Sequence, residues 1–159
     1  MKTAKLLIAP ALIGIYIAIA FLTVPTLDDR ASISDVITKG AAAVTDRDLS
    51  ALVSLVSRQY SDDLGLNHDR LRLLIARELR NEAPYDLSIS KQEIEVDGER
   101  AEARMQVVFK HRGGDVFYDR ELTFIFARET GRHLLVAPAP VWRVISSENL
   151  GLSAGDVAL

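Results

Sequence analysis

The chain has 159 residues, of which 48% are hydrophobic and 26% charged, and its formal net charge is -3. This length allows one domain of ordinary size with an appendage. The lack of a basic excess removes the electrostatic case for a nucleic-acid partner. The absence of cysteine excludes disulfides, thiolate metal sites, thiol nucleophiles and lipid attachment through an N-terminal cysteine.

An uncharged apolar run from Leu6 to Val24 opens the chain, preceded by Lys2 and Lys5 and closed by Pro25. About 19 residues are just enough to cross a bilayer core of about 30 Å as a helix. Because flanking lysines stay on the cytoplasmic side, the rest of the chain is expected to face outward. We therefore predict a single-pass anchor in the cytoplasmic membrane over residues 1–25.

A cleaved signal peptide is the competing interpretation of this segment. The small residues from Ala18 to Ala20 fit a cleavage site, and cleavage near Ala20 would release a secreted or periplasmic domain. The apolar run continues through Phe21 and Leu22, which favours the anchor. Either interpretation exports the domain, and residues 26–33 are predicted to form a short polar linker.

The segment from Ser34 to Val56 spaces its apolar residues as one face of a helix. Gly40 and the TDRD segment, residues 45–48, predict a break in this pattern. Thr45 or Asp46 is then expected to cap a second helical piece, with its side-chain oxygen accepting a free backbone N–H.

Residues 60–69, YSDDLGLNHD, interrupt the helical pattern with several oxygen-bearing side chains. Hard oxygen ligands of this kind bind calcium, but their spacing is not that of the twelve-residue calcium loop. A turn between two helices explains the stretch better, with Gly65 following the first helix and Asn67 capping the second. Pro84 is predicted to end this second helix. We therefore predict no metal at the candidate ligands Asp62, Asp63, Asn67 and Asp69.

After Pro84 the apolar period changes from helical to alternating. Residues 100–111 and 116–129 are predicted to form a hairpin across an RGGD loop. One register places both apolar sets on the same face, and a slip by one residue would lose this. The predicted inner pairs are His111–Val116, Phe109–Tyr118, Met105–Leu122, Ala103–Phe124 and Ala101–Phe126. The predicted outer pairs are Lys110–Phe117 and Arg104–Thr123.

Further strands are predicted in residues 87–98, 133–137 and 141–146. With helices first and an antiparallel meander afterwards, the fold class is α+β, in which helices pack on a curved antiparallel sheet. The end of the chain, residues 148–159, is small and polar enough to be a flexible tail.

This order of elements resembles the nuclear transport factor 2-like superfamily, which includes SnoaL-like and ketosteroid isomerase-like domains. The resemblance covers residues 34–147 and rests on DRDLSALVSLVS, YSDDLG, VDGERAEARMQVVF and VWRVIS. It implies a cone-shaped, cystatin-like fold, which is found in enzymes, ligand binders and assembly modules alike. Some members with a single N-terminal span belong to bacterial secretion machinery, so the resemblance also implies a partner in the envelope.

The mouth of such a cone is the predicted ligand pocket. Arg120 would bind an anionic or polar ligand there, with His111 as a titratable neighbour. The interpretation that the residues favour is structural: Arg120 reaches solvent with its stem over Val107, and His111 only ends its strand. The candidate pocket residues are Tyr60, Met105, Phe109, His111, Tyr118, Arg120 and Phe124.

Catalysis of an isomerase or dehydratase type would need a base in the cavity and a group that stabilises an oxyanion. The predicted inner face of the hairpin contains no aspartate or glutamate, so His111 with Tyr118 is its only candidate pair. The histidines His68, His111 and His133 lack the spacing of a zinc site. We therefore predict neither a metal nor a cofactor.

The predicted function is a membrane-tethered, non-catalytic binding or assembly module facing the extracytoplasmic side. A carrier of a small apolar or anionic ligand, or an enzyme that uses the apolar cavity, is the alternative. A homodimer through the outer face of the sheet would use Phe117 and Ile125 as apolar contacts.

Overall fold

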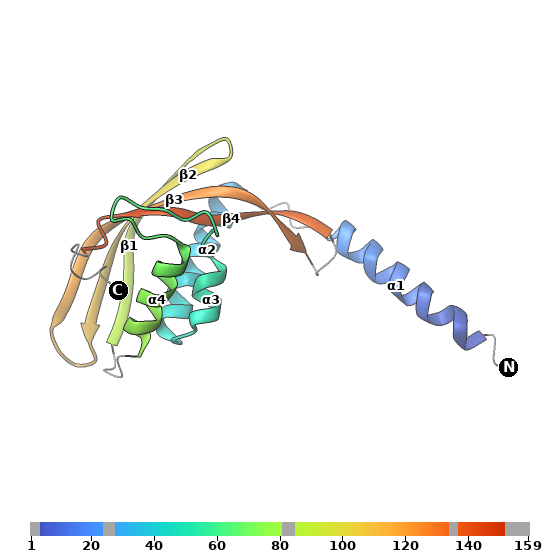
Figure 1. Cartoon of the computed structure of the whole chain (residues 1–159), viewed down its shortest axis with the longest axis horizontal. Helices are drawn as coiled ribbons and strands as arrows, with labels where there is room; N and C mark the ends of the chain where they lie inside the picture. The colour runs from blue at the N-terminus through green and yellow to red at the C-terminus, as the bar shows by residue number, and fades with distance from the viewer. Residues whose placement is uncertain (1–3, 24–27, 81–84, 134–136, 152–159) are drawn as a thin grey trace. The chain divides into compact units, whose positions relative to one another are not determined.

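The computed structural model describes residues 4–23, 28–80, 85–133 and 137–151 (Figure 1), with side chains from residue 13 onward except at residue 133. The chain divides into two compact units. One comprises Met1–Leu27 and Glu129–Val141, and the other comprises Asp28–Arg128 and Trp142–Leu159. The second unit contains nearly all of the predicted domain.

The first unit contains helix α1, which spans Ala4–Leu22. Large apolar side chains along it are exposed, Leu22 by 85%. Among the described residues, no helix has the length and apolar character needed to span a bilayer. The anchor predicted over residues 1–25 therefore gains no support from the structure and stays a prediction.

Helix α2 spans Asp29–Thr45, so the predicted linker over residues 26–33 is helical from Asp29 on. Asp29 lies in the first turn, where a carboxylate complements the helix dipole. Ile33 and Ile37 lie one turn apart and are both buried in the core. The break predicted at Gly40 is wrong, because one glycine costs a helix only about 1 kcal/mol and burial of this apolar face outweighs that cost.

Helix α3, Leu49–Ser54, is short. Its cap is Asp48, whose side chain accepts from the backbone N–H of Ala51 at 2.9 Å. Thr45 was predicted as a cap but is the last residue of α2, and its hydroxyl donates backward to a carbonyl in that helix. The break predicted at the TDRD segment, residues 45–48, is confirmed, because α2 ends at Thr45 and α3 begins at Leu49. The cap of α3 lies within this segment, at Asp48, and not at the predicted Thr45 or Asp46.

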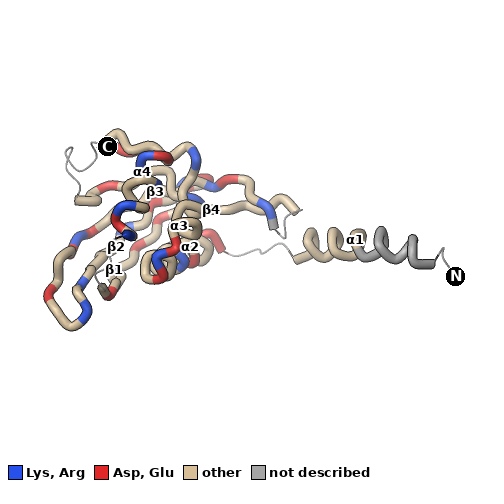
Figure 2. Tube along the Cα trace, turned by 60° about the horizontal axis from the view of Figure 1, so that its bottom comes forward, with Lys and Arg blue, Asp and Glu red and all other residues tan. Residues whose placement is uncertain are grey.

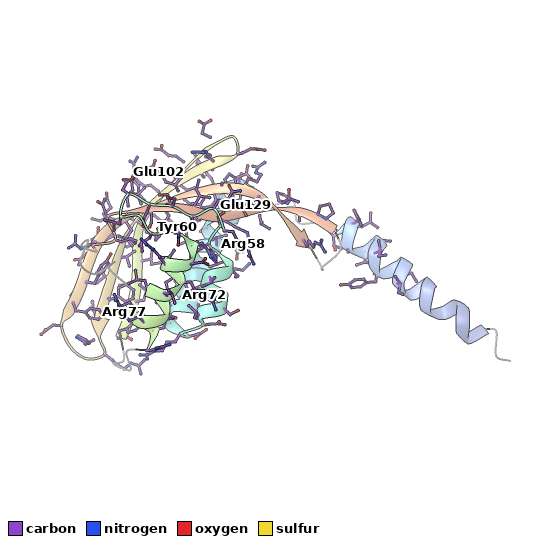
Figure 3. The ribbon with its side chains drawn as sticks, in the orientation of Figure 1. Arg58, Tyr60, Arg72, Arg77, Glu102 and Glu129 are labelled. Atoms are coloured by element: carbon purple, nitrogen blue, oxygen red, sulfur yellow. The ribbon has the colours of Figure 1, made fainter. Side chains whose placement is uncertain are left out.

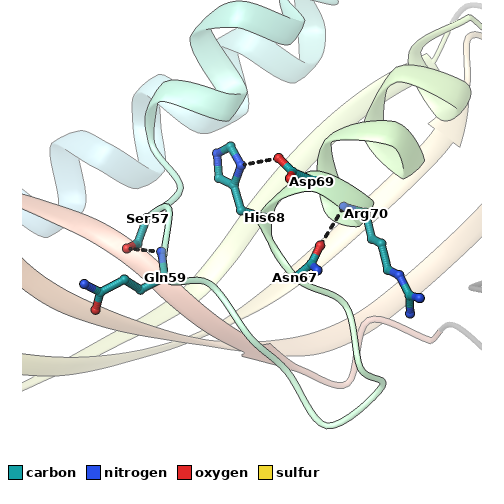
Figure 4. Close-up of polar contacts among 6 residues, drawn as sticks. All are labelled: Ser57, Gln59, Asn67, His68, Asp69 and Arg70. Carbon is teal, nitrogen blue, oxygen red and sulfur yellow. Dashed lines mark hydrogen bonds and ion pairs between the residues drawn. The ribbon is translucent and has the colours of Figure 1, made fainter.

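Helix α4, His68–Leu79, begins where the sequence predicted. The side chain of Asn67 accepts from the backbone N–H of Arg70 at 3.0 Å (Figure 4), which confirms Asn67 as the N-cap. Leu74 is the buried residue of this helix. Together with α2 and α3, α4 lies on one side of the curved sheet (Figure 1).

The sheet has four strands in the order β1-β2-β3-β4. They span Tyr85–Asp97, Arg100–His111, Val116–His133 and Ala137–Glu148. β2 pairs antiparallel with both β1 and β3, so the predicted α+β class is confirmed. Four predicted inner pairs and one outer pair are also confirmed: Phe109–Tyr118, Met105–Leu122, Ala103–Phe124, Ala101–Phe126 and Arg104–Thr123.

The loop end of the hairpin differs from the prediction because it contains a β-bulge. Lys110 pairs with Val116 although Phe109 pairs with Tyr118, so Phe117 is the extra residue. The predicted pairs His111–Val116 and Lys110–Phe117 are therefore wrong. Strict alternation in the sequence assumes a regular ladder, and one inserted residue shifts every pair beyond it.

The main core lies between α2 and the inner face of the sheet. Its fully buried members include Ile33, Ala103, Met105 and Phe126. Leu150 packs against this core after the end of β4. Leu150, in the predicted tail over residues 148–159, therefore packs on the domain, whereas residues 152–159 lie outside the described part.

A second, smaller core joins the chain between α3 and α4 to β4. It is built from Tyr60, Leu66 and Leu74. The backbone of Val56 forms a parallel bridge with Val144 of β4. Figure 3 labels Tyr60 between the sheet and the helices, whereas Glu102 lies on the opposite, outer side of the sheet.

Candidate functional site

The seven predicted pocket residues do not gather in one place. Met105, 1% exposed, is a member of the main core, and Phe124 packs against that core. Tyr60 belongs to the smaller core instead. The remaining four lie near the loop end of the β2–β3 hairpin, so the candidate site is confined to that end.

Aromatic rings cover the loop end of the hairpin. The rings of His111 and Phe117 stack with centroids 4.5 Å apart. Phe109 contacts Phe117 at 5.9 Å and Tyr118 edge-on at 5.7 Å. A bulge can re-aim a side chain, and here it brings Phe117 onto the side of Phe109. Phe117 is 52% exposed, but it no longer serves as the predicted outer-face contact.

Residues 149–151, here called the C-terminal strap, cross the inner face beside this aromatic group. The hydroxyl of Tyr118 donates to the carbonyl oxygen of Leu150 at 3.1 Å, and the Leu150 side chain packs on the main core. Gly151 has φ +71°, and a Cβ added there would lie 2.6 Å from Nε of Arg120. The strap therefore occupies the predicted mouth, where it is bonded to Tyr118 and lies beside Arg120.

Arg120 is exposed and forms no ion pair with another described residue. Its guanidinium lies against the backbone of Gly151 instead. Burial raises the pKa of Tyr118, although the positive charge of Arg120 acts in the opposite direction. At neutral pH the mouth thus presents a phenol that donates one hydrogen bond and a cation with no described carboxylate beside it.

Tyr60 forms a separate, closed polar cluster. Its hydroxyl donates to Oδ2 of Asp62 at 3.0 Å and shares a hydrogen bond of 2.5 Å with Oγ of Ser147. Oδ1 of Asp62 accepts from the backbone N–H groups of Leu64 and Leu66. Burial, partly opposed by the Ser147 hydrogen bond, strongly raises the pKa of Tyr60. This cluster fastens the turn to β4, and its Tyr60 hydroxyl stays protonated at neutral pH.

The turn interpretation of residues 60–69 is confirmed by these contacts. Both carboxylate oxygens of Asp62 accept hydrogen bonds from the protein itself, and the carboxylate of Asp69 faces the His68 ring at 3.3 Å (Figure 4). Within the described ranges, no group of three or more histidine or acidic side chains is arranged to hold a metal ion.

Sequence reasoning missed a third polar cluster, around Asp29. The indole N–H of Trp142 donates to Oδ1 of Asp29 at 3.2 Å, and the guanidinium of Arg128 pairs with Oδ2 while lying 5.0 Å from the Trp142 ring centroid. We predicted Asp29 in the linker. The position of Asp29, one helical turn before Ile33 and on the stripe that α2 buries, could have indicated that its side chain faces the domain.

The outer face of the sheet carries a shallow depression lined by Glu93, Glu95, Glu102 and Arg104. Arg104 pairs with Glu102 at 2.6 Å, and their hydrogen bond raises the pKa of the guanidinium. Charges of both signs alternate along the described chain (Figure 2). Arg104 therefore neutralises part of the negative charge of this depression.

No family model matches the chain, and no curated protein matches it. Solved structures do match in fold. An NTF2-like protein of unknown function from Pseudomonas putida is 14% identical at a TM-score of 0.61, over 76% of this chain and 86% of that one. A protein from Mycobacterium tuberculosis, also of unknown function, is 13% identical at a TM-score of 0.60, over 75% of this chain and 73% of that one.

A third structure, from Streptomyces avermitilis, has a name that proposes a dehydratase of the NTF2-like family. It is 14% identical at a TM-score of 0.55, over 75% of this chain and 93% of that one. Identities this low carry the fold and not the activity. The chain has an NTF2-like, cystatin-like α+β fold.

Proposed function

We propose that this chain is a membrane-tethered assembly module that works without catalysis on the extracytoplasmic side of the cytoplasmic membrane. The observation that carries this proposal is the covered mouth. The Tyr118 hydroxyl is already bonded to Leu150, and Arg120 lies against Gly151. A mouth occupied by the chain's own strap favours recognition of another chain over turnover of a small substrate.

The alternative, an enzyme that uses His111 and Tyr118, has little support from the positions of these two residues. Its base would be His111, but this ring is exposed and stacked on Phe117. The oxyanion donor would be Tyr118, which the strap engages. A general base must lie within hydrogen-bond reach of the substrate proton, and no described contact brings His111 and Tyr118 to a common substrate position.

The tether part of the proposal rests on the sequence of the first segment. Residues 6–24 are uncharged and follow Lys2 and Lys5, and a helix of about 19 residues would be about 28 Å long at 1.5 Å per residue. The lysines would remain in the cytoplasm. Domain residues 34–147 would then lie outside, within reach of partners in the envelope.

The absence of cysteine allows a direct test of the tether. Asp97→Cys and Thr3→Cys variants of the full chain are treated with a membrane-impermeant maleimide in intact bacterial cells. We expect labelling of Asp97→Cys in intact cells, labelling of Thr3→Cys only after permeabilisation, and retention of both in carbonate-washed membranes. A soluble periplasmic product that has lost its first residues would overturn the tether, and protection of Asp97→Cys in intact cells would overturn export.

A separate test addresses assembly. Cross-linking of the full chain in native membranes through Ile125→Cys is expected to give a discrete adduct if the outer face is an interface. Glu121→Cys, an exposed position on the same strand, is the matched control. The bulge removes Phe117 from this face, so Ile125 is the apolar contact that remains from the predicted homodimer. Equal cross-linking at both positions would count against a specific outer-face interface.

A further inference from the structure

The C-terminal strap occupies the mouth with three chemical features, and each has a matching group on the domain. An aliphatic side chain, that of Leu150, packs on the main core. A carbonyl oxygen accepts from Tyr118 at 3.1 Å. The chain then continues through Gly151, directly beside Nε of Arg120. The Leu150 side chain and carbonyl oxygen each match the group that they contact. At Gly151, by contrast, the cation of Arg120 faces an uncharged backbone.

Arg120 is the mismatch in this arrangement. It forms no ion pair with another described residue, yet it lies at the one point of the strap where a negative charge would be complementary. An arginine next to a hydroxyl donor is a strong pair of groups for a carboxylate, because both donate toward the same anion. The strap engages the donor and leaves the charge unmatched.

A peptide that ends at the position of Leu150 would match all three groups. Its terminal carboxylate would place one oxygen where the Leu150 carbonyl now accepts from Tyr118. The second oxygen would replace the nitrogen of Gly151, the residue that lies beside Arg120. The leucine side chain would keep its place on the core, so only the charge is new.

We propose that the mouth formed by Tyr118, Arg120 and the adjoining surface of the main core is a receptor for the free carboxyl end of a partner polypeptide that terminates in an aliphatic residue, and that the strap occupies this receptor until the partner displaces it. Capture of a terminal carboxylate is an established mode of peptide recognition, and here the donors would be two side chains. This inference names the partner chemistry for the proposed assembly role and rests on that role for its meaning.

The strap is expected to lower the affinity of the wild-type protein for the partner. A receptor filled by a covalently attached segment binds an outside ligand only in the fraction of molecules from which that segment is displaced. Weakening the strap must therefore strengthen partner binding. Removal of Arg120 must weaken binding of a carboxylate without changing binding of a neutral ligand.

The test uses the full-length chain in lipid nanodiscs and fluorescein-labelled Glu-Asn-Leu, with either a free carboxylate or a C-terminal amide, measured by fluorescence anisotropy. Leu150→Ser is expected to bind the acid at least tenfold more tightly than wild type does. Leu64→Ser carries the same substitution at an exposed leucine elsewhere and is expected to match wild type. In Leu150→Ser the acid should bind at least tenfold more tightly than the amide.

The second half of the test removes the charge. In the Leu150→Ser background, Arg120→Gln is expected to abolish the preference for acid over amide, whereas Arg112→Gln, at a neighbouring exposed arginine, should keep it. Equal binding of acid and amide, an unaltered preference in Arg120→Gln, or no peptide binding by Leu150→Ser would each overturn the proposal. None of these outcomes bears on the cysteine-labelling result, so failure here and failure of the tether are distinguishable.

Discussion

Two tyrosines fasten C-terminal segments of this chain to the domain, and they do so in contrasting ways. Tyr60 is buried, and its hydroxyl has two partners, Asp62 and Ser147. Tyr118 is half-buried and donates once, to the backbone of Leu150. A buried polar group that loses its partner bears the full desolvation cost, whereas a half-exposed one can turn to water. The same side chain is therefore a permanent attachment in one place and a replaceable contact in the other.

The most severe test of this contrast is Asp62→Ala. The substitution removes the acceptor of two backbone N–H groups and of the Tyr60 hydroxyl. We expect the free energy of unfolding to fall by about 3 kcal/mol, since each bond to an ionised group contributes about 1.5–3 kcal/mol without full additivity. Urea unfolding followed by fluorescence of the single tryptophan, Trp142, measures this change.

The matched control for that experiment is Asp63→Ala. Asp63 is adjacent and exposed, and surface substitutions of this kind change stability by no more than about 0.5 kcal/mol. Equal losses in the two alanine variants would mean that the cluster around Asp62 contributes nothing beyond its charge.

Tyr60→Phe tests the hydroxyl alone. The change keeps the ring in the smaller core but leaves Oδ2 of Asp62 without its donor. We expect a loss of about 1–2 kcal/mol, the cost of an unsatisfied buried group. The same urea titration gives the value, and a loss below that of Tyr118→Phe would contradict the contrast between the two sites.

The raised pKa of Tyr60 predicts how stability depends on alkaline pH. The ordinary pKa of a tyrosine, as in the unfolded chain, is 10.0, and burial keeps the folded group protonated above that pH. The contribution of Tyr60 to stability is then constant below pH 10 and falls as the pH rises above 10, because only the unfolded state releases this proton. The slope from one proton is about 1.4 kcal/mol per pH unit. A Tyr60→Phe variant with the same alkaline slope as wild type would contradict this assignment.

Tyr118→Phe should have the smallest effect. It removes a single half-exposed hydrogen bond to the strap, so we expect a loss of about 0.5–1 kcal/mol. Hydrogen exchange of the Leu150 amide should accelerate in this variant while the core strands stay protected. If global stability fell as far as in Tyr60→Phe, the strap would be part of the permanent fold and not a replaceable segment.

The inward-facing residues of each strand at the candidate site were predictable from that strand's own sequence. The two wrong pairs, His111–Val116 and Lys110–Phe117, both result from the bulge at Phe117. The inner set of β2 and β3 followed from alternation, and the pairs from Ala101–Phe126 to Phe109–Tyr118 are confirmed. The bulge at Phe117 was not predictable, because a single extra residue leaves the alternating pattern of each strand intact. Its effect appears only when the two strands are paired.

The α+β class, the N-cap of α4 and the turn at residues 60–69 followed from the amino-acid order, because they depend on local periodicity and on side chains that bond to nearby backbone groups. Only folding of the whole domain revealed that Asp29 pairs with Arg128, that Tyr60 meets Ser147 and that residues 149–151 cover Tyr118. Each of these contacts joins residues far apart in the chain. Local pattern carries no information on such pairs, since they form only when the sheet curves over its helices.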